Sequence, residues 1–599
     1  MLYSGSFAYD VFGPFLFIYF IFLIFVDSVN LSSVKPRHSS IHDTLEFGSP
    51  QNALLSSLTS IIRQGLGDRS RAVTVLHPSS ISRPTSQAHP STPDIIFIGI
   101  IHNNPQRAFH LVDHGPPADD QDQVALEQFR DFWGEKSELR RFKDGRIVES
   151  VVWEVTTADE MTHVPSIIIR HLLKRHFNID ETNDIETWQT SFDSVLRLPQ
   201  SISQKYLDSK ILTGFKGALN AFDSLVKAIK KLDDHQLPLT VLNISPSSEF
   251  LRYTSIFSPV PLPSTLATSF PENARYLAPM EIIIEFEKSS KWPDDLKAIQ
   301  YIKLAFFEQL AVGLEESVQG LKAKIVMDDD DGVSDIQDKA CLEIVTLEGW
   351  AFSMRIWHDR EIILLDRIIS GSGNLPHIVV KTKNNSHKSK EYYEALRAKT
   401  VYLRRFIHGP RHHRVISALY HLYPAFSGTV RLVKRWLGSH WLLGSWISEE
   451  VVEIICASFF VGDGRGRPGG SSIVDVDIDT EERQRHLVPG SKERGFSIVV
   501  QFLKDWKWED GLMVPLYGDV LSDNASNAAA PLIPHKGVWK VSTEHDKEGY
   551  VWTSNGPDLL VAHRVRSLAD ATWNCLQTLE RARIDIKVSG FFSSNFFFS

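Results

Sequence analysis

One stretch of the sequence carries many cations and no acids. Between Ala395 and Ser448 there is no Asp or Glu. Arg431, Lys434 and Arg435 recur at steps of three and four residues, which places them on one face of a predicted helix that starts near Thr429. Such a stripe neutralises phosphates and releases counterions, so it predicts salt-dependent, largely sequence-independent RNA binding. The cations of this stretch are Arg397, Lys399, Arg404, Arg405, Arg411, Arg414, Arg431, Lys434 and Arg435.

The same stripe has a structural interpretation. A basic helix face can be solvated, or it can dock on an acidic neighbour in the same chain. It can also bind an acidic protein partner. Residue types and spacing leave these alternatives open.

A second basic cluster lies in the string LRRFKDG, residues 139–145. Aromatic side chains interleaved with Arg can stack on nucleic-acid bases. We favour the structural interpretation here, in which Trp133 and Phe142 anchor a core and Asp144-Gly145 turns the chain into a following strand. The cluster's cations are nonetheless candidate RNA contacts: Arg140, Arg141 and Lys143.

Other motifs suggest no metal or cofactor. The acidic run Asp328–Asp331 would point its side chains to alternate faces, so a solvated loop is expected. Gly462–Gly470 (GDGRGRPGG) lacks the Lys-Ser/Thr ending of a phosphate-binding loop. His412-His413 has no metal-ligand spacing and no partner Cys. The cysteines show no CxxC pattern and favour a reducing compartment: Cys341, Cys456 and Cys575.

The bulk composition is that of a multidomain globular protein. The chain has 599 residues, 43% of them hydrophobic and 23% charged, which predicts several domains and little wholesale disorder. The net charge of -9 means that any nucleic-acid binding must come from local basic surfaces.

The first 93 residues read differently from the rest. Phe15–Val26 is an apolar run shorter than the roughly 20 residues that span a bilayer, and no Lys or Arg precedes it. We therefore do not expect membrane attachment, although an anchor or signal remains the alternative. The Ser- and Pro-rich segment from Asn30 to Pro93 is predicted to be mainly a linker, with a short helical pattern at 53–64. We expect the apolar run to be extraneous and the chain to be partial, and the sequence leaves open whether residues 1–93 and the Phe-rich C-terminus belong to the protein.

The folded part is expected to begin at Asp94. Strands are predicted at 94–102 and 146–154, followed by a helix at 166–176. A second unit begins with a helix at 221–232 and continues as four strands interrupted by a long helix at 293–316, a pattern typical of an α+β domain with a mixed sheet. Helices dominate after Lys388. The predicted helices span 390–406, 414–422, 429–437, 448–460 and 493–505, and 538–568 is predicted to start a sheet-like unit that stops too early to bury a core.

Long strings in this order resemble the nucleolar RNA-associated protein (Nrap) family. They are AFHLVDHGPPADD with FRDFWGEKSELRRFKDGRIVESVVWE, LPLTVLNISPSSEFLRYTSIF with EFEKSSKWPDDLKAIQYIKLAFF, and RLVKRWLGSHWL with WISEEVVEII, PGSKERGF and LKDWKWED. The resemblance covers residues 94–579. It implies a third family domain at 94–199, a nucleotidyltransferase-like domain at 200–385, a helical domain like that of poly(A) polymerase and oligoadenylate synthetase at 386–518, and a truncated final domain at 519–599.

The resemblance also says where a nucleotidyltransferase would carry its active site. Such enzymes hold two magnesium ions on acidic side chains, next to a Gly-Ser turn. Here SPSSEFLRYTS follows LPLTVLNI, without that turn. The nearest acids are Glu285 and Glu287 on one predicted strand and Glu343 on another. The transferase signature has Asp at these three positions. Three replacements of Asp by Glu, together with a missing Gly-Ser turn, argue against catalysis.

We therefore expect a non-catalytic RNA-binding scaffold. By resemblance it would belong to the small-subunit processome in the nucleolus, assist pre-18S ribosomal RNA processing, and bind pre-ribosomal RNA and other processome proteins, but not DNA. The alternatives are an active template-independent nucleotidyltransferase and a purely protein-binding scaffold.

Overall fold

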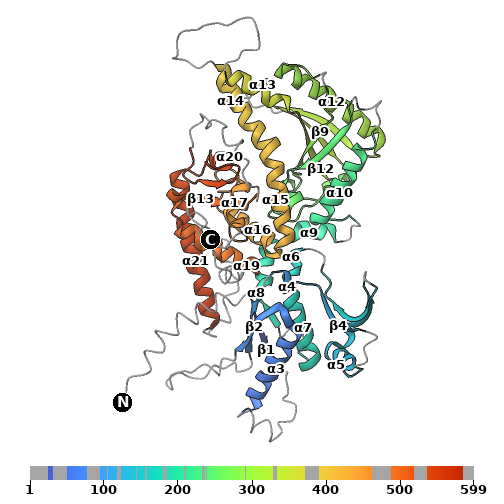
Figure 1. The fold of residues 1–599 in the computed structure, drawn as a ribbon, viewed down its shortest axis with the longest axis vertical. Helices are drawn as coiled ribbons and strands as arrows, with labels where there is room; N and C mark the ends of the chain where they lie inside the picture. The colour runs from blue at the N-terminus through green and yellow to red at the C-terminus, as the bar shows by residue number, and fades with distance from the viewer. Residues whose placement is uncertain are drawn as a thin grey trace.

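The computed structural model describes residues 25–584, except 31–46, 48–49, 77–94, 104, 118–122, 143–144, 156–157, 180–184, 208–210, 233–236, 238, 290–291, 328–333, 371–389, 462–487 and 518–535. The Asp328–Asp331 run, the glycine loop, the Phe-rich C-terminus and most of the Phe15–Val26 run lie outside this part. Within it, no helix is both long and apolar enough to cross a membrane. The expected α+β multidomain architecture is confirmed (Figure 1).

The N-terminal unit is larger than expected. Its four-stranded sheet has the order β2-β3-β1-β7 and pairs β3 (Ile95–His102) with both β1 (Phe25–Asn30) and β2 (Ser70–Leu76). Helix α3 (Pro50–Leu66) lies against α7 (Val164–Phe177), and β7 spans Ile185–Thr187. The prediction of a linker from Asn30 to Pro93 is therefore wrong for β2, whereas the short helical pattern predicted at 53–64 is confirmed by α3. Three residues of α3 are fully buried because they follow helical spacing: Leu58, Ile62 and Leu66.

A three-stranded sheet of order β4-β6-β5 completes this unit. It contains β4 (Val112–Pro117), β5 (Ser137–Arg141) and β6 (Ile147–Val152), with α5 (Gln123–Trp133) beside them. Trp133 is 5% exposed and belongs to the core of the unit, as predicted. Phe142 is half-buried and packs on the ring of His114.

The nucleotidyltransferase-like unit is built on a five-stranded sheet of order β10-β11-β12-β9-β8. Strands β9 (Met280–Phe286) and β12 (Ala351–Trp357) run parallel, and the other neighbours are antiparallel, so the expected mixed sheet is confirmed. Strands β8 (Val241–Pro246) and β11 (Ala340–Val345) were predicted, whereas β10 (Lys322–Met327) was not. One face packs Ile282, Ile284, Leu342 and Phe352 against α12 (Leu296–Ser317) and α10 (Gly214–Ile229).

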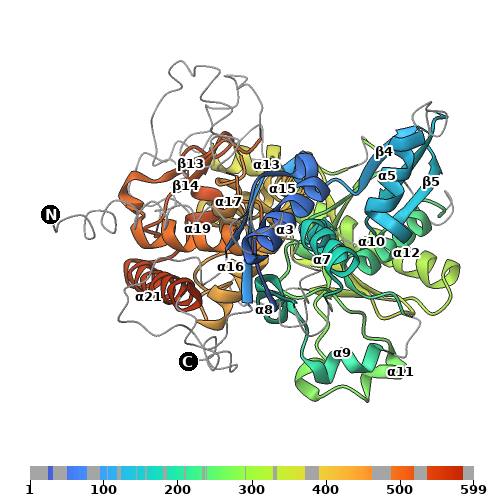
Figure 2. The same ribbon diagram turned by 90° about the horizontal axis from the view of Figure 1, so that it is seen from below.

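A long helical run joins this sheet to the C-terminal unit. Helix α14 (Lys390–Tyr402) continues through a π-helical turn, η6 (Leu403–His408), into α15 (Gly409–Leu422). Figure 1 shows the run passing from α13 (Arg360–Ile369) toward the helices of the C-terminal unit, several of which lie together in Figure 2. Tyr402 and Phe406 are buried in the core of the sheet unit, and Ile416 and Leu419 in the next core.

The C-terminal unit contains α16 (Pro424–Ser439), α17 (Glu449–Ala457), α19 (Lys492–Asp505), α20 (Tyr550–Thr553) and α21 (Leu559–Ile584), with β13 (Leu512–Val514) and β14 (Val541–Thr543). The prediction that 538–568 stops too early to bury a core is wrong. Trp539, Val541, Val565 and Trp573 all enter the core formed by α16, α17 and α19. Phe192 of α8 (Trp188–Leu196) enters the same core, although it lies far away in sequence.

Candidate functional site

The strand register separates the acids that a transferase site would require. Glu343 of β11 pairs with Ser353 of β12, which in turn pairs with Glu281 of β9. Glu285 pairs with Trp357, four residues further along β9. Glu285 and Glu343 are therefore offset by about 13 Å along the strands and about 10 Å across them.

Two catalytic metal ions sit only about 3.5–4 Å apart, so acids at this offset cannot hold a metal pair together. Glu287 lies just beyond the end of β9, where its backbone N–H donates to Thr240. In the described part of the chain, no group of three or more His, Cys, Asp or Glu residues is arranged to hold a metal ion. The structure therefore does not bring together the three acids of the alternative prediction.

A buried ion cluster lies beside the sheet. Arg355 of β12 lies opposite Ile283, and its Nη1 is 3.2 Å from Asp338 Oδ2. Lys303 of α12, fully buried, is 3.0 Å from Asp338 Oδ1 and 2.7 Å from Glu361 Oε1. Although burial favours the protonated acid, the charges of Lys303, Arg355 and Arg405 hold the pKa of Asp338 below its usual value.

Arg405, a predicted RNA contact, belongs to this cluster. Its Nη1 lies 3.1 Å from Asp338 Oδ2, and its side chain is 22% exposed. Trp357 Nε1 donates to the Tyr402 hydroxyl at 2.7 Å. Side chains of α14 and η6 therefore reach the sheet and this ion cluster, and Arg405 is held by an internal acid.

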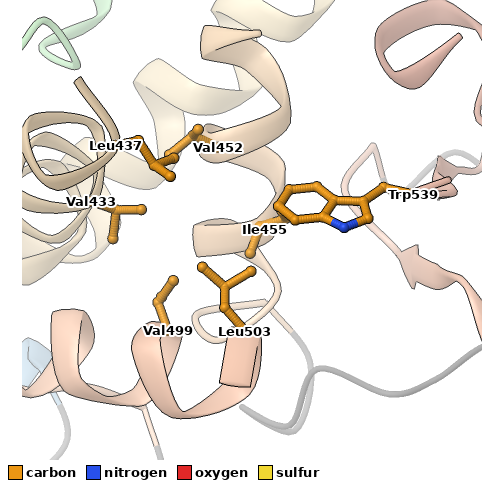
Figure 3. Close-up of a pocket in the computed structure, with 7 residues that line it drawn as sticks. All are labelled: Val433, Leu437, Val452, Ile455, Val499, Leu503 and Trp539. Atoms are coloured by element: carbon orange, nitrogen blue, oxygen red, sulfur yellow. The ribbon is translucent and has the colours of Figure 1, made fainter. Parts of the chain in front are cut away.

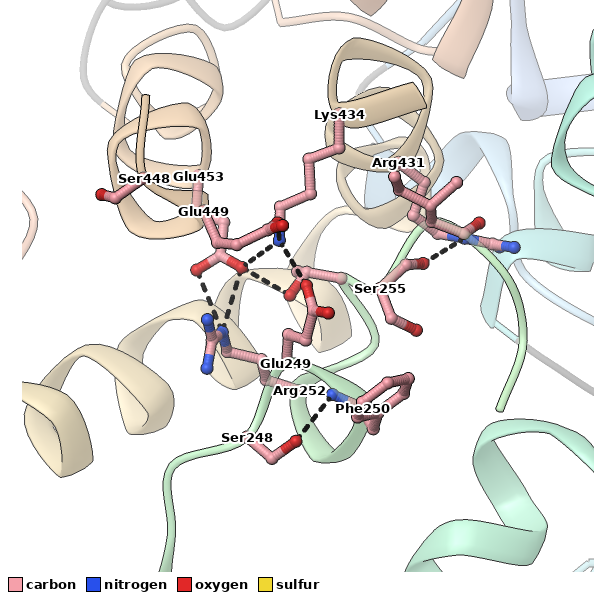
Figure 4. A network of polar contacts seen from close by, with 12 residues as sticks. Ser248, Glu249, Phe250, Arg252, Ser255, Arg431, Lys434, Ser448, Glu449 and Glu453 are labelled. Atoms are coloured by element: carbon pink, nitrogen blue, oxygen red, sulfur yellow. Dashed lines mark hydrogen bonds and ion pairs between the residues drawn. The ribbon is translucent and has the colours of Figure 1, made fainter. Parts of the chain in front are cut away.

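The segment that replaces the Gly-Ser turn forms a short helix. Ser248 caps η4 (Glu249–Arg252), because its Oγ accepts from the backbone N–H of Phe250 at 3.3 Å. Arg252 is 3% exposed, and its Nε donates to both carboxylate oxygens of Glu453 on α17 at 2.9 and 3.0 Å. Thr254 Oγ1 donates to the same carboxylate at 2.6 Å. This segment therefore docks on the C-terminal unit (Figure 4).

Lys434 completes this network and is not a surface residue. Its side chain is fully buried, and its Nζ lies 2.8 Å from Glu453 Oε1, 3.0 Å from Glu249 Oε2 and 2.6 Å from Glu449 Oε2. His412 of α15 is 2.5 Å from Glu453 Oε2. Burial favours protonated Glu453, but Arg252 and Lys434 override it and hold the pKa of this acid well below its usual value.

The expected basic stripe on α16 is therefore wrong as a surface. Arg431 is 7% exposed; its Nε donates to the carbonyls of Ser255 and Ile256 at 3.1 and 3.2 Å, and it lies over the Phe215 ring. Arg435 is half-buried over the Phe257 ring. The residues share one helix face as predicted, but that face docks on the segment around η4. Docking on an acidic neighbour in the same chain is the alternative that the structure confirms.

The remaining candidate cations fall into two groups. Arg404 is 42% exposed, pairs with Glu450 at 3.5 Å and lies over the Trp552 ring, and Arg140 pairs with Glu138 on the same strand. Arg411 and Arg414 on α15 and Arg141 on β5 are exposed and have no ion-pair partner among the described residues. Lys143 lies outside that part of the chain. These three arginines keep the charge that phosphate binding requires.

A cavity in the C-terminal core is too small for a substrate. Its volume is about 10 Å³, and it is lined by apolar side chains (Figure 3). A space of that size is at the lower limit for a single water molecule. The residues around it are Val433, Leu437, Val452, Ile455, Val499, Leu503 and Trp539.

Sequence reasoning missed Glu453, the acid at the centre of the network. A signal was present, because Glu453 interrupts the apolar string VVEIIC on a predicted helix. An acid at such a position is buried only when cations pair with it. Its partners Arg252 and Lys434 come from other elements, so the pairing itself was not visible.

The sheet unit followed by this helical unit defines a nucleotidyltransferase-like chain with a domain like that of poly(A) polymerases. The description "Nrap protein domain 3" matches residues 23–178, "Nrap protein nucleotidyltransferase domain 4" matches 191–421, and "Nrap protein PAP/OAS1-like domain 5" matches 423–594. The three matches follow one another and leave little of the chain unmatched. The chain belongs to the Nrap family.

Curated relatives are longer than this chain. U3 small nucleolar RNA-associated protein 22 of Schizosaccharomyces pombe is 29% identical over 546 residues, which cover 88% of this chain and 43% of the relative. Nucleolar protein 6 of Xenopus laevis is 27% identical, over 88% of this chain and 41% of the relative. The chain thus spans less than half the length of these relatives. A solved structure titled "Crystal structure of mtPAP in complex with CTP" covers 88% of this chain and 96% of its own, with 9% identity and a TM-score of 0.33, too low to support an argument.

Proposed function

We propose that this chain is a non-catalytic scaffold of ribosome biogenesis that acts in the nucleolus. The observation that carries the proposal is the buried network around Glu453. In this network the segment after β8, where a transferase carries its Gly-Ser turn, joins the sheet unit to the C-terminal unit. We call this network the clamp. The offset of Glu285 from Glu343 supports the same conclusion.

The names of the relatives support the setting. One is called a U3 small nucleolar RNA-associated protein and another a nucleolar protein. We infer from these names that the chain works in the small-subunit processome, with pre-ribosomal RNA and other processome proteins as partners. Assistance to pre-18S ribosomal RNA processing is the corresponding role.

The RNA contacts proposed here are the cations that the structure leaves exposed. Arg411 and Arg414 lie one turn apart on α15, close enough to contact neighbouring phosphates. Arg141 provides a separate contact on the N-terminal unit. Arg404 can contribute only by giving up Glu450. Arg431 and Lys434 are excluded, because exposing them would break the clamp.

A nucleotide-incorporation assay tests the non-catalytic part. The full chain is incubated with an RNA primer, labelled nucleotides, and magnesium or manganese, beside a double variant with Glu285→Ala and Glu287→Ala. We expect no extension from a folded preparation that still retards the primer at low salt. Extension that disappears in the double variant would overturn the proposal and make the chain an enzyme.

A preparation that is folded but never retards RNA would point to the other alternative. A purely protein-binding scaffold would then account for the same clamp. Crosslinking of RNA to Arg411 and Arg414 at low salt, lost at high salt, would distinguish an RNA-binding scaffold from a purely protein-binding one.

A further inference from the structure

The loop between α16 and α17 presents an exposed tryptophan in an unusual backbone position. Trp441 is 85% exposed, and its φ is 60°. The Trp441 N–H donates to Gly438 O, and the Leu442 N–H donates to Leu437 O, both at 3.1 Å. This pair of hydrogen bonds is the Schellman closure of a helix, in which the left-handed residue is usually Gly.

A bulky side chain at this position is unfavourable on two grounds. The left-handed conformation strains an L residue with a Cβ, and the indole ring remains in water, although Trp is a highly buried residue type on average. Leu442, the next residue, is 1% exposed and anchors the loop in the core. The fold therefore needs the turn and the Leu442 anchor, and it does not need the Trp441 ring.

A second segment extends this surface. At Gly556 an added Cβ would lie 2.6 Å from the Trp446 carbonyl oxygen, so the chain before α21 passes directly against the loop. Arg564 of α21 donates to the His440 carbonyl at 3.4 Å. Trp446 is 45% exposed and Leu560, at the start of α21, is 79% exposed. We call Trp441, Trp446, Leu560 and Arg564 the tryptophan surface.

The charges near the tryptophan surface favour an anionic partner. Arg564 is exposed. Two acids of the adjoining segments are engaged in the fold: Asp558 caps α21 through the Val561 N–H at 2.8 Å, and Glu449 pairs with buried Lys434. Exposed indole rings beside an arginine are a combination that can stack unpaired bases and contact their phosphates.

We infer that the tryptophan surface binds single-stranded RNA, with Trp441 stacking on a base and Arg564 contacting the backbone. The inference rests on the proposed RNA-binding function and adds a site to it. A duplex keeps its bases stacked on one another, so the surface should discriminate single strands from duplexes.

Binding of a labelled single-stranded oligonucleotide and of a matched duplex to the full chain tests this inference. Trp441→Ala should weaken single-strand binding by roughly tenfold or more and leave duplex binding unchanged, whereas Trp441→Phe should keep most of the affinity. Because Trp441 is uncharged, the salt dependence of the remaining binding should not change. Tyr276→Ala, at an aromatic residue 81% exposed on another unit, is the matched control.

Trp441→Gly separates binding from folding. Gly relieves the strained φ, so this variant should be at least as heat-stable as the wild type and still lose single-strand affinity. If Trp441→Ala binds single strands as the wild type does, while an Arg411→Ala, Arg414→Ala variant has a reduced salt dependence, the inference fails and the proposed function stands. The exposed ring would then belong to a protein contact. A wild-type chain that binds no RNA would overturn both.

Discussion

Arg252 and Glu453 are 201 residues apart in sequence, yet their side chains lie 2.9 Å apart with almost no exposure to solvent. One comes from the short helix that follows β8, the other from the middle of α17. Opposite charges buried at this depth stabilise a fold only when both partners are present. This pair therefore couples the sheet unit to the C-terminal unit.

Glu453→Gln should destabilise the chain strongly. It leaves Arg252 and Lys434 buried with reduced compensation, which costs about 3–5 kcal/mol when one partner of a buried pair is removed. Denaturant unfolding followed by tryptophan fluorescence measures this. Glu308→Gln, on the exposed face of α12, is the control and should change little. Equal stability of both variants would contradict the coupling.

The pKa of Glu449 leads us to expect that the stability of the fold depends on pH. Burial and the charge of Glu249 raise its pKa to about 7 despite Lys434. Between about pH 4.5, where the unfolded acid ionises, and pH 7, the folded chain keeps a proton that the unfolded chain has lost, so stability falls as pH rises.

Glu449→Gln cannot lose that proton. Relative to the wild type, this variant should gain stability by an amount on the order of 3 kcal/mol as pH rises through this window. Unfolding curves at pH 4.5, 6 and 8 for both chains provide the measurement. If the stability of the two chains changed equally with pH, Glu449 would not titrate in this window.

Exposed and buried cations should differ in RNA binding. Removing Arg411 and Arg414 together should reduce the slope of log affinity against log salt by about 1.4 for a single strand. Lys434→Met should leave the slope of the folded fraction unchanged while lowering stability, because Lys434 is fully buried. Fluorescence anisotropy of a labelled RNA at several salt concentrations measures this slope for both variants. A reduced slope in Lys434→Met would mean that the clamp opens on RNA.

The N-terminal segment makes a simpler prediction. Ile62 is fully buried in the core of the first unit, so Ile62→Ala should cost about 2–5 kcal/mol. Arg63→Ala, at the neighbouring exposed position, should be close to neutral. Limited proteolysis between residues 50 and 180 reports this loss locally. If both variants resisted proteolysis equally, the segment would be a linker, as the sequence predicted for most of the stretch from Asn30 to Pro93.

Sequence patterns predicted most of the helices and strands that have a clear apolar pattern. The apolar run of β3, four of the strands of the five-stranded sheet and α12 were found, whereas β10 was not. The missed elements had weaker local signals. The helical pattern of α3 was found at 53–64, but the strand β2 that follows it was missed, because composition outweighed spacing in this Ser- and Pro-rich stretch.

By itself, the sequence determined which residues share a helix face or a strand face, because period and side-chain direction are local properties of the backbone. That is why Arg431, Lys434 and Arg435 lie on one side of α16. Only the tertiary structure decided what covers that side, since Glu249 and Glu453 reach Lys434 from elements that the chain brings together over long distances. Strand register likewise decided that Glu285 and Glu343 lie apart. Register depends on pairing between strands, which no single strand encodes.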